Sequence, residues 1–171
     1  MSGKTPGIKM LVVLVGVCLI SAAVLGYVHI TTYDRIEMNR MKRIKDAVYQ
    51  VLPGVTEYEQ VNEKPVIYKG YKDETVIGYA VLAEGMGFQG NIVLMVGIDK
   101  EIKNIKGTVV LESVETPGLG DRIKEDSFLD QFDNTAVSEN MKVSAITGAT
   151  ISSVAVEKIA NKSVKDVKRI H

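Results

Sequence analysis

The sequence predicts an α+β protein, in which one transmembrane helix is followed by a single domain with an antiparallel sheet and packed helices. Three features predict this class: a long uncharged apolar segment, a series of short β-branched runs divided by polar turns, and a final segment with helical periodicity. Of the 171 residues, we assign 1–33 to the amino-terminal segment with its transmembrane helix and 34–171 to the domain. About 140 residues is an ordinary size for one core.

The apolar segment from Met10 to Val28 contains 19 residues and no charge. At about 1.5 Å per residue it spans roughly 28 Å as a helix, close to the thickness of the hydrocarbon layer. A cleaved signal peptide is the alternative, but its apolar core is usually shorter, and no clear small-residue cleavage site follows. A lipoprotein site at Cys18 is disfavoured because Val17 before it is bulky. The segment therefore predicts a single-pass membrane helix.

Charges near this helix do not define its orientation. Lys4 and Lys9 precede it, and five basic residues follow it within about 20 residues: Arg35, Arg40, Lys42, Arg43 and Lys45. By the positive-inside rule these favour a cytoplasmic domain, but the rule is weaker for a long tail.

Beyond the membrane, apolar residues recur at helical spacing from Asp34 to Val51 and predict an amphipathic helix that ends at Pro53-Gly54. Its basic residues could bind anionic headgroups, although a solvated face is the commoner role. The next four runs predict an antiparallel meander: Val66–Tyr71, Thr75–Leu82, Asn91–Ile98 and Ile102–Val110.

Three further elements complete the expected domain. Helical spacing predicts a helix over Arg122–Phe132, and a short apolar run predicts a strand over Met141–Ile146. A terminal helix of about twenty residues is expected from Ile151 to Ile170.

Composition removes several classes of function. Cys18 is the single cysteine and lies in the apolar segment, and the two histidines are His29 and His171. These counts argue against a disulfide, a thiolate metal site and a cysteine nucleophile in the domain, and against a histidine-based triad or zinc site. Residues 34–171 carry 19 basic and 21 acidic side chains, which makes nucleic acid an improbable partner.

The segment Ser144–Ser153 is a hydroxyl-rich turn with a glycine, placed before the terminal helix. The unpaired N–H groups of a helix amino terminus stabilise a phosphate. Alternatively, Thr147 or Thr150 caps the helix, which is the commoner role of Ser and Thr at that position. Ser152 and Ser153 either place hydroxyls near a phosphate or support the first helical turn.

Within this segment Thr147-Gly148-Ala149-Thr150 resembles the flavinylation motif of the FMN-binding domain family. The resemblance implies that a flavin transferase joins FMN through a phosphoester to Thr150. Ser144 stands where the family motif usually has Asp. Ser144, Thr147, Gly148 and Ala149 are then expected beside the cofactor.

A second block, Glu115-Thr-Pro-Gly-Leu-Gly120, also resembles the family, which implies that Glu115, Thr116, Leu119 and Gly120 border the isoalloxazine. Pro117-Gly118 is also an ordinary type II turn, and an exposed loop carboxylate is usually only solvated. A third block, Gly85–Ile92, resembles the glycine segment upstream of that loop. Its G-x-G-x-x-G spacing precedes a strand, so it is not a dinucleotide fingerprint.

Together with the membrane helix, these blocks resemble the G subunit of Rnf ion-translocating electron-transport complexes, which is related to the C subunit of sodium-translocating NADH:quinone reductase. The resemblance implies a one-electron relay in the cell inner or plasma membrane, with its domain outside the cytoplasm. It also implies partner subunits of a ferredoxin/NAD redox-driven ion pump and no independent turnover. Two alternatives are a membrane-anchored structural or sensory module without flavin, and an enzyme that uses noncovalent flavin.

Overall fold

The computed structural model describes residues 6–137 and 141–170. Helix α1 (Pro6–Val51) is followed by strands β1 (Glu57–Glu63), β2 (Val66–Lys72), β3 (Thr75–Met86), β4 (Asn91–Asp99) and β5 (Ile105–Ser113). The 3-10 helix η1 (Gly120–Lys124) and the helices α2 (Asp126–Leu129) and α3 (Thr150–Ile170) complete the fold. The chain divides into two compact units between Lys42 and Arg43, inside α1.

The first unit consists of the larger part of α1, which is one continuous helix of 46 residues. Its apolar side chains are exposed on all sides, as the consecutive residues Leu11, Val12 and Val13 illustrate at 59%, 64% and 65% exposure. A helix that is apolar all round needs an apolar surrounding. α1 is long and apolar enough to cross a membrane.

In the second unit, the strands form one antiparallel sheet in the order β1-β2-β3-β4-β5, which confirms the predicted meander. β1 was not predicted because it is an edge strand with mainly exposed side chains and no apolar alternation. β5 begins at Ile105 instead of Ile102 because Ile102 lies in a turn with φ 56°. The carboxylate of Asp99 closes that turn by accepting from the Lys103 N–H at 2.7 Å.

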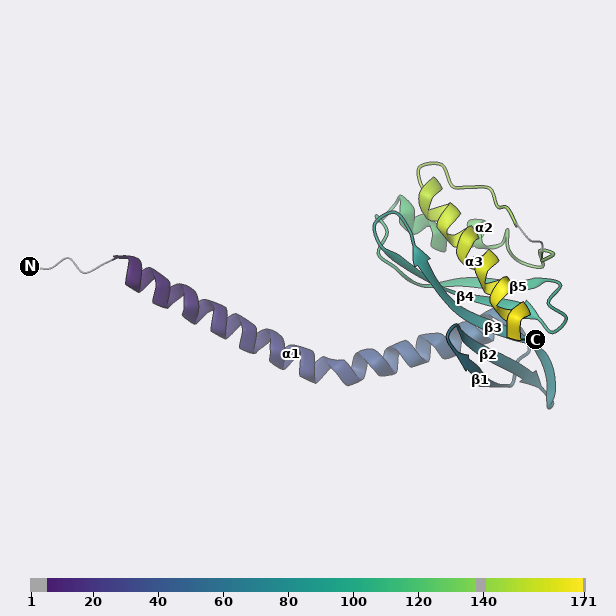
Figure 1. The fold of residues 1–171 in the computed structure, drawn as a ribbon, viewed down its shortest axis with the longest axis horizontal. Helices are drawn as coiled ribbons and strands as arrows, with labels where there is room; N and C mark the ends of the chain where they lie inside the picture. The colour runs from purple at the N-terminus through teal and green to yellow at the C-terminus, as the bar shows by residue number, and fades with distance from the viewer. Residues whose placement is uncertain (1–5, 138–140, 171) are drawn as a thin grey trace, which may run out of the picture. The chain divides into compact units, whose positions relative to one another are not determined.

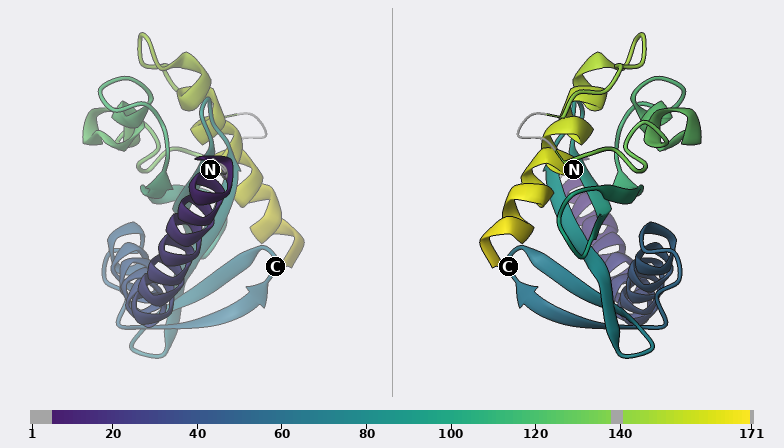
Figure 2. Two further views of the ribbon diagram at one scale, coloured as in Figure 1. Left: turned by 90° about the vertical axis from the view of Figure 1, so that its left-hand side faces the viewer. Right: turned by 90° about the vertical axis from the view of Figure 1, so that its right-hand side faces the viewer.

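Both faces of the sheet are covered (Figures 1 and 2). α3 packs on one face, where the larger core includes Val81, Leu94 and Val156. The last turns of α1 pack on the other face, where Val48 and Val51 are fully buried. The predicted terminal helix is confirmed, and it begins at Thr150, one residue before the predicted start.

Close approach of α1 to the sheet depends on glycine. A Cβ placed on Gly97 would lie 2.0 Å from the Val51 carbonyl oxygen, and one on Gly107 would lie 3.2 Å from the Val51 Cα. The first distance is far inside van der Waals contact, whereas the second requires only a small adjustment. Gly97 therefore fixes how closely the helix end packs.

We expect Gly97→Ala to lower the free energy of unfolding by about 1–3 kcal/mol, the usual cost of overpacking a core. Gly107→Ala is the matched control and should cost less, because its nearest contact is longer. Urea unfolding of both variants measures the difference. Equal losses would contradict this account of the close approach.

Two sequence predictions between the sheet and α3 were wrong. The single helix expected over Arg122–Phe132 is two short ones, because Glu125 has extended backbone (ψ 137°) between η1 and α2. Its apolar residues are nonetheless in the core, where Phe128 and Phe132 pack edge to face at 5.8 Å between ring centroids.

The strand expected over Met141–Ile146 is also absent, since these residues join no sheet. Side chains of α3 bind their N–H groups instead: Asn161 accepts from Met141, Glu157 from Val143 and Ser153 from Ile146, at 3.0–3.1 Å. The acceptors are four residues apart and so lie on one face of the helix. The segment therefore runs extended along α3, and an apolar run alone does not distinguish this from a strand.

Candidate functional site

The turn before α3 is held by its own backbone and by one serine. Gly148 has φ +85°, a conformation that favours glycine, and the Ala149 N–H donates to the Ile146 carbonyl at 2.9 Å. The buried Ser153 hydroxyl donates to the Ala149 carbonyl at 2.9 Å and accepts from the Ile146 N–H at 3.1 Å. Ser153 therefore supports the first turn of the helix, and its hydroxyl is not directed to a phosphate.

Thr150 is the first residue of α3 and is exposed. Among the described residues, neither Thr147 nor Thr150 accepts a hydrogen bond from a helix amide, so the capping interpretation was wrong. Within the same residues, the N–H groups of 150–152 have no backbone acceptor. A free hydroxyl thus lies beside three N–H groups that suit a phosphate.

Glu115 is buried, with 5% of its surface exposed, although the sequence suggested an exposed loop carboxylate. One carboxylate oxygen accepts from the backbone N–H groups of Phe88 and Gln89, at 2.9 and 3.1 Å. The other accepts from the Ser152 hydroxyl at 2.5 Å. Glu115 thereby joins the β3–β4 turn to the first turn of α3, and the Ser152 hydroxyl is used for this contact.

Burial alone would raise the pKa of the Glu115 carboxyl group. The hydrogen bonds from Ser152 and from the N–H groups of Gln89, Phe88 and Gly90 outweigh that effect, and the pKa lies below its ordinary value. Glu115 is therefore ionised at neutral pH.

Two glycines make room for this carboxylate. A Cβ on Gly87 would lie 2.4 Å from one Glu115 oxygen, and a Cβ on Gly120 would lie 2.6 Å from the other. These glycines come from the third and second sequence blocks, so both blocks contribute to one arrangement around Glu115.

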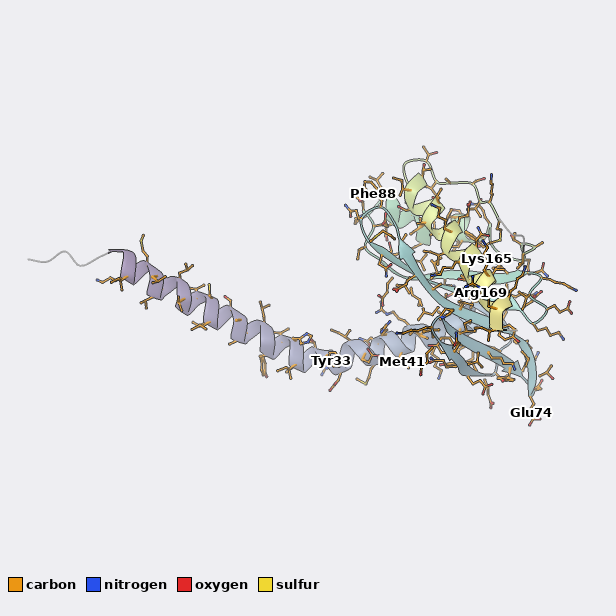
Figure 3. The ribbon with its side chains drawn as sticks, viewed as in Figure 1. Tyr33, Met41, Glu74, Phe88, Lys165 and Arg169 are labelled. Atoms are coloured by element: carbon orange, nitrogen blue, oxygen red, sulfur yellow. The ribbon has the colours of Figure 1, made fainter. Side chains whose placement is uncertain are left out.

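A cavity of about 290 Å³ lies between the blocks, close to the lower end of the range for small-molecule sites. Its walls come from three parts of the chain: Phe88, Glu115, Thr116, Leu119, Gly120, Gly148, Ala149, Thr150, Ile151 and Ser152. The rim is apolar and accessible, since Phe88, Leu119 and Ile151 are 66%, 53% and 58% exposed. Phe88 lies at the turn between β3 and β4, as labelled in Figure 3.

The cavity brings together most of the residues that the sequence singled out, but not Ser144 or Thr147, which do not line it. Ser144 is instead paired with Gln131, which accepts from the Ser144 N–H at 2.7 Å and donates to its carbonyl at 3.3 Å. Sequence reasoning did not assign Phe88 or Ile151 to the site. An aromatic residue inside a glycine-rich turn was the available signal for Phe88.

This arrangement suits a ligand with a flat apolar part and a phosphate. The apolar rim can cover the flat part, while the start of α3 offers N–H donors and the Thr150 hydroxyl. In the described ranges, 6–137 and 141–170, no group of three or more His, Cys, Asp or Glu side chains could hold a metal ion. The apolar rim, together with the N–H donors beside the Thr150 hydroxyl, fits FMN.

Residues 87–165 match the family model of the FMN-binding domain. The chain is 33% identical to the G subunit of the ion-translocating oxidoreductase complex of Methanosarcina acetivorans, over 86% of this chain and 87% of that one. It is 31% identical to the G subunit of the proton-translocating ferredoxin:NAD(+) oxidoreductase complex of Clostridium ljungdahlii, over 88% and 85% of the two chains.

The fold is shared with a solved structure, that of the C subunit of the Na(+)-translocating NADH-quinone reductase from Parabacteroides distasonis. The TM-score is 0.58 at 18% identity, over 80% of this chain and 94% of that one. The expected resemblance is therefore confirmed in both sequence and fold. The protein belongs to the family of G subunits of ion-translocating oxidoreductase complexes and has an FMN-binding domain.

Proposed function

We propose that the protein is a membrane-anchored electron-transfer subunit that carries FMN covalently bound through a phosphoester to Thr150. The observation that carries this proposal is the position of Thr150. Its exposed hydroxyl lies at the start of α3, beside three N–H groups without backbone acceptors, on the wall of an apolar cavity. A phosphate on Thr150 would accept hydrogen bonds from those N–H groups and gain from the helix dipole.

When bound, the flavin supplies the redox chemistry, because it can hold one or two extra electrons. The chain then tethers and orients it. Thr116, Leu119 and Gly120 would border the ring system together with Phe88 and Ile151, and Gly148 and Ala149 would lie beside the phosphate. Glu115 would hold the cavity walls together from behind.

A test for covalent flavin distinguishes this function from the two alternatives, a noncovalent flavin enzyme and a structural or sensory module without flavin. After coexpression with a flavin transferase, the denatured protein should fluoresce as a flavin band in a gel. A noncovalent flavin enzyme would lose its cofactor on denaturation, and a structural or sensory module would have none. A dark band from protein coexpressed with an active transferase would therefore disprove the proposal.

We further propose that α1 crosses the membrane once and that the domain lies outside the cytoplasm. Support for the membrane crossing comes from the exposed apolar side chains of α1 and from the family of ion-translocating complex subunits to which the protein belongs. The side on which the domain lies is proposed from the resemblance of the sequence to Rnf G subunits. The bilayer, the other subunits of the complex and the flavin transferase are its proposed partners.

Orientation can be measured with an introduced cysteine. In a Cys18→Ser background, Lys72→Cys places one thiol at an exposed position at the end of β2. We expect this thiol to react with an impermeant maleimide in intact cells. Labelling that appears only after lysis would place the domain in the cytoplasm.

The relay function predicts that the subunit does not turn over a substrate alone. Relatives are named as subunits of complexes that involve ferredoxin and NAD(+), so donor and acceptor are expected on partner subunits. The purified flavinylated full chain should not oxidise NADH at a catalytic rate. Rapid NADH oxidation without partners would favour an independent enzyme.

A further inference from the structure

Glu115 is the one ionisable side chain among the ten described residues that line the cavity. It is buried, and hydrogen bonds keep its pKa low, so the cavity contains a fixed negative charge at neutral pH. In the described part of the chain, no basic side chain forms an ion pair with the Glu115 carboxylate.

A neutral residue could have satisfied the same donors in part. Phe88, Gln89 and Ser152 donate to the carboxylate, and the amide oxygen of a glutamine in its place could accept from the two backbone N–H groups. The three donors thus explain why residue 115 has a hydrogen-bond acceptor. They do not require that this acceptor carry a negative charge, so the charge of Glu115 needs a separate explanation.

We propose that the buried carboxylate of Glu115 lowers the reduction potential of a flavin bound in this cavity, in addition to positioning the cavity walls. Reduction adds an electron to the flavin, and a nearby negative charge in a poorly solvated site disfavours that gain. The inference rests on the proposed function, because it requires flavin in the cavity next to Thr150.

The test compares midpoint potentials of the flavinylated full chain in detergent, measured by spectroscopic redox titration. Glu115→Gln keeps the size of the side chain and an acceptor oxygen but removes the charge. We expect a positive shift equivalent to at least a tenfold change in the one-electron equilibrium, which corresponds to about 59 mV. Glu115→Asp retains the charge, so its flavin potential should lie close to that of the wild type and below that of Glu115→Gln.

Glu112→Gln is the matched control, because it removes the same charge from an exposed position. Glu112 lies on β5 outside the cavity, 3.6 Å from Arg43. The midpoint potential of the flavin in Glu112→Gln should equal that in the wild type. An equal shift in both variants would show a general charge effect and overturn the inference.

If Glu115→Gln does not fold, Thr116→Lys provides the second test, since it adds a positive charge to the same wall. The midpoint potential of the flavin in Thr116→Lys should be higher than in the wild type, and an unchanged potential would overturn the inference. A wild-type band without flavin fluorescence would refute the proposed function itself. Normal fluorescence with unchanged potential in Glu115→Gln would refute this inference alone.

Discussion

Thr150→Val should abolish covalent FMN attachment while the domain still folds. Valine keeps the β-branched shape of threonine but lacks the oxygen that would form the phosphoester. The side chain is exposed and its hydroxyl forms no hydrogen bond within the described part of the chain, so its loss leaves no buried partner unsatisfied. We therefore expect a change in the free energy of unfolding within about 0.5 kcal/mol, as for an ordinary surface substitution.

Thr147→Val is the matched control, since it makes the same change three residues earlier in the same turn. Because Thr147 is exposed and caps no helix amide among the described residues, this variant should also change stability little. Its peptide should still carry FMN on Thr150. Peptide mass mapping after coexpression with a flavin transferase distinguishes the two variants, and an adduct on the Thr150→Val peptide would refute the assignment.

The parts of the fold that sequence predicted are those with a strong local pattern. β-branched runs between polar turns indicated β2 to β5, and helical periodicity indicated α3. The errors occurred where tertiary contacts override local pattern. Side chains of α3 bind the backbone of Met141–Ile146, and the exposed edge strand β1 has no apolar period to detect.

The candidate site shows the same difference between features that a local sequence pattern predicts and features that depend on tertiary contacts. Motif resemblance identified Thr150 and the Glu115–Gly120 block, and the structure brings both to one cavity. Burial of Glu115 was not predictable, because its donors are backbone groups 26 and 27 residues earlier and a serine 37 residues later. Only folding brings these three segments together, so a loop carboxylate in the sequence becomes a buried contact.

Glu115→Ala should lower the free energy of unfolding by about 3 kcal/mol at neutral pH. It removes the acceptor of two backbone N–H groups and one buried hydroxyl, and each unsatisfied buried donor costs about 1–3 kcal/mol. The lower end applies to the N–H groups of Phe88 and Gln89, because their turn is partly exposed and water can replace the carboxylate. Glu112→Ala, at an exposed position on β5, should cost less than about 0.5 kcal/mol.

The cost of Glu115→Ala should also depend on pH. Since the pKa of Glu115 is lower in the folded chain than its ordinary value of 4.5, folding favours the ionised form. That contribution is fully present above pH 4.5 and is lost as pH falls through the folded pKa, because the carboxyl group must then bind a proton in the folded state. Urea unfolding of the full chain in detergent, followed by circular dichroism, should show the difference between wild type and Glu115→Ala shrinking only below about pH 4.5. A difference that stayed constant into acid would mean that the hydrogen bonds at Glu115 do not depend on its charge.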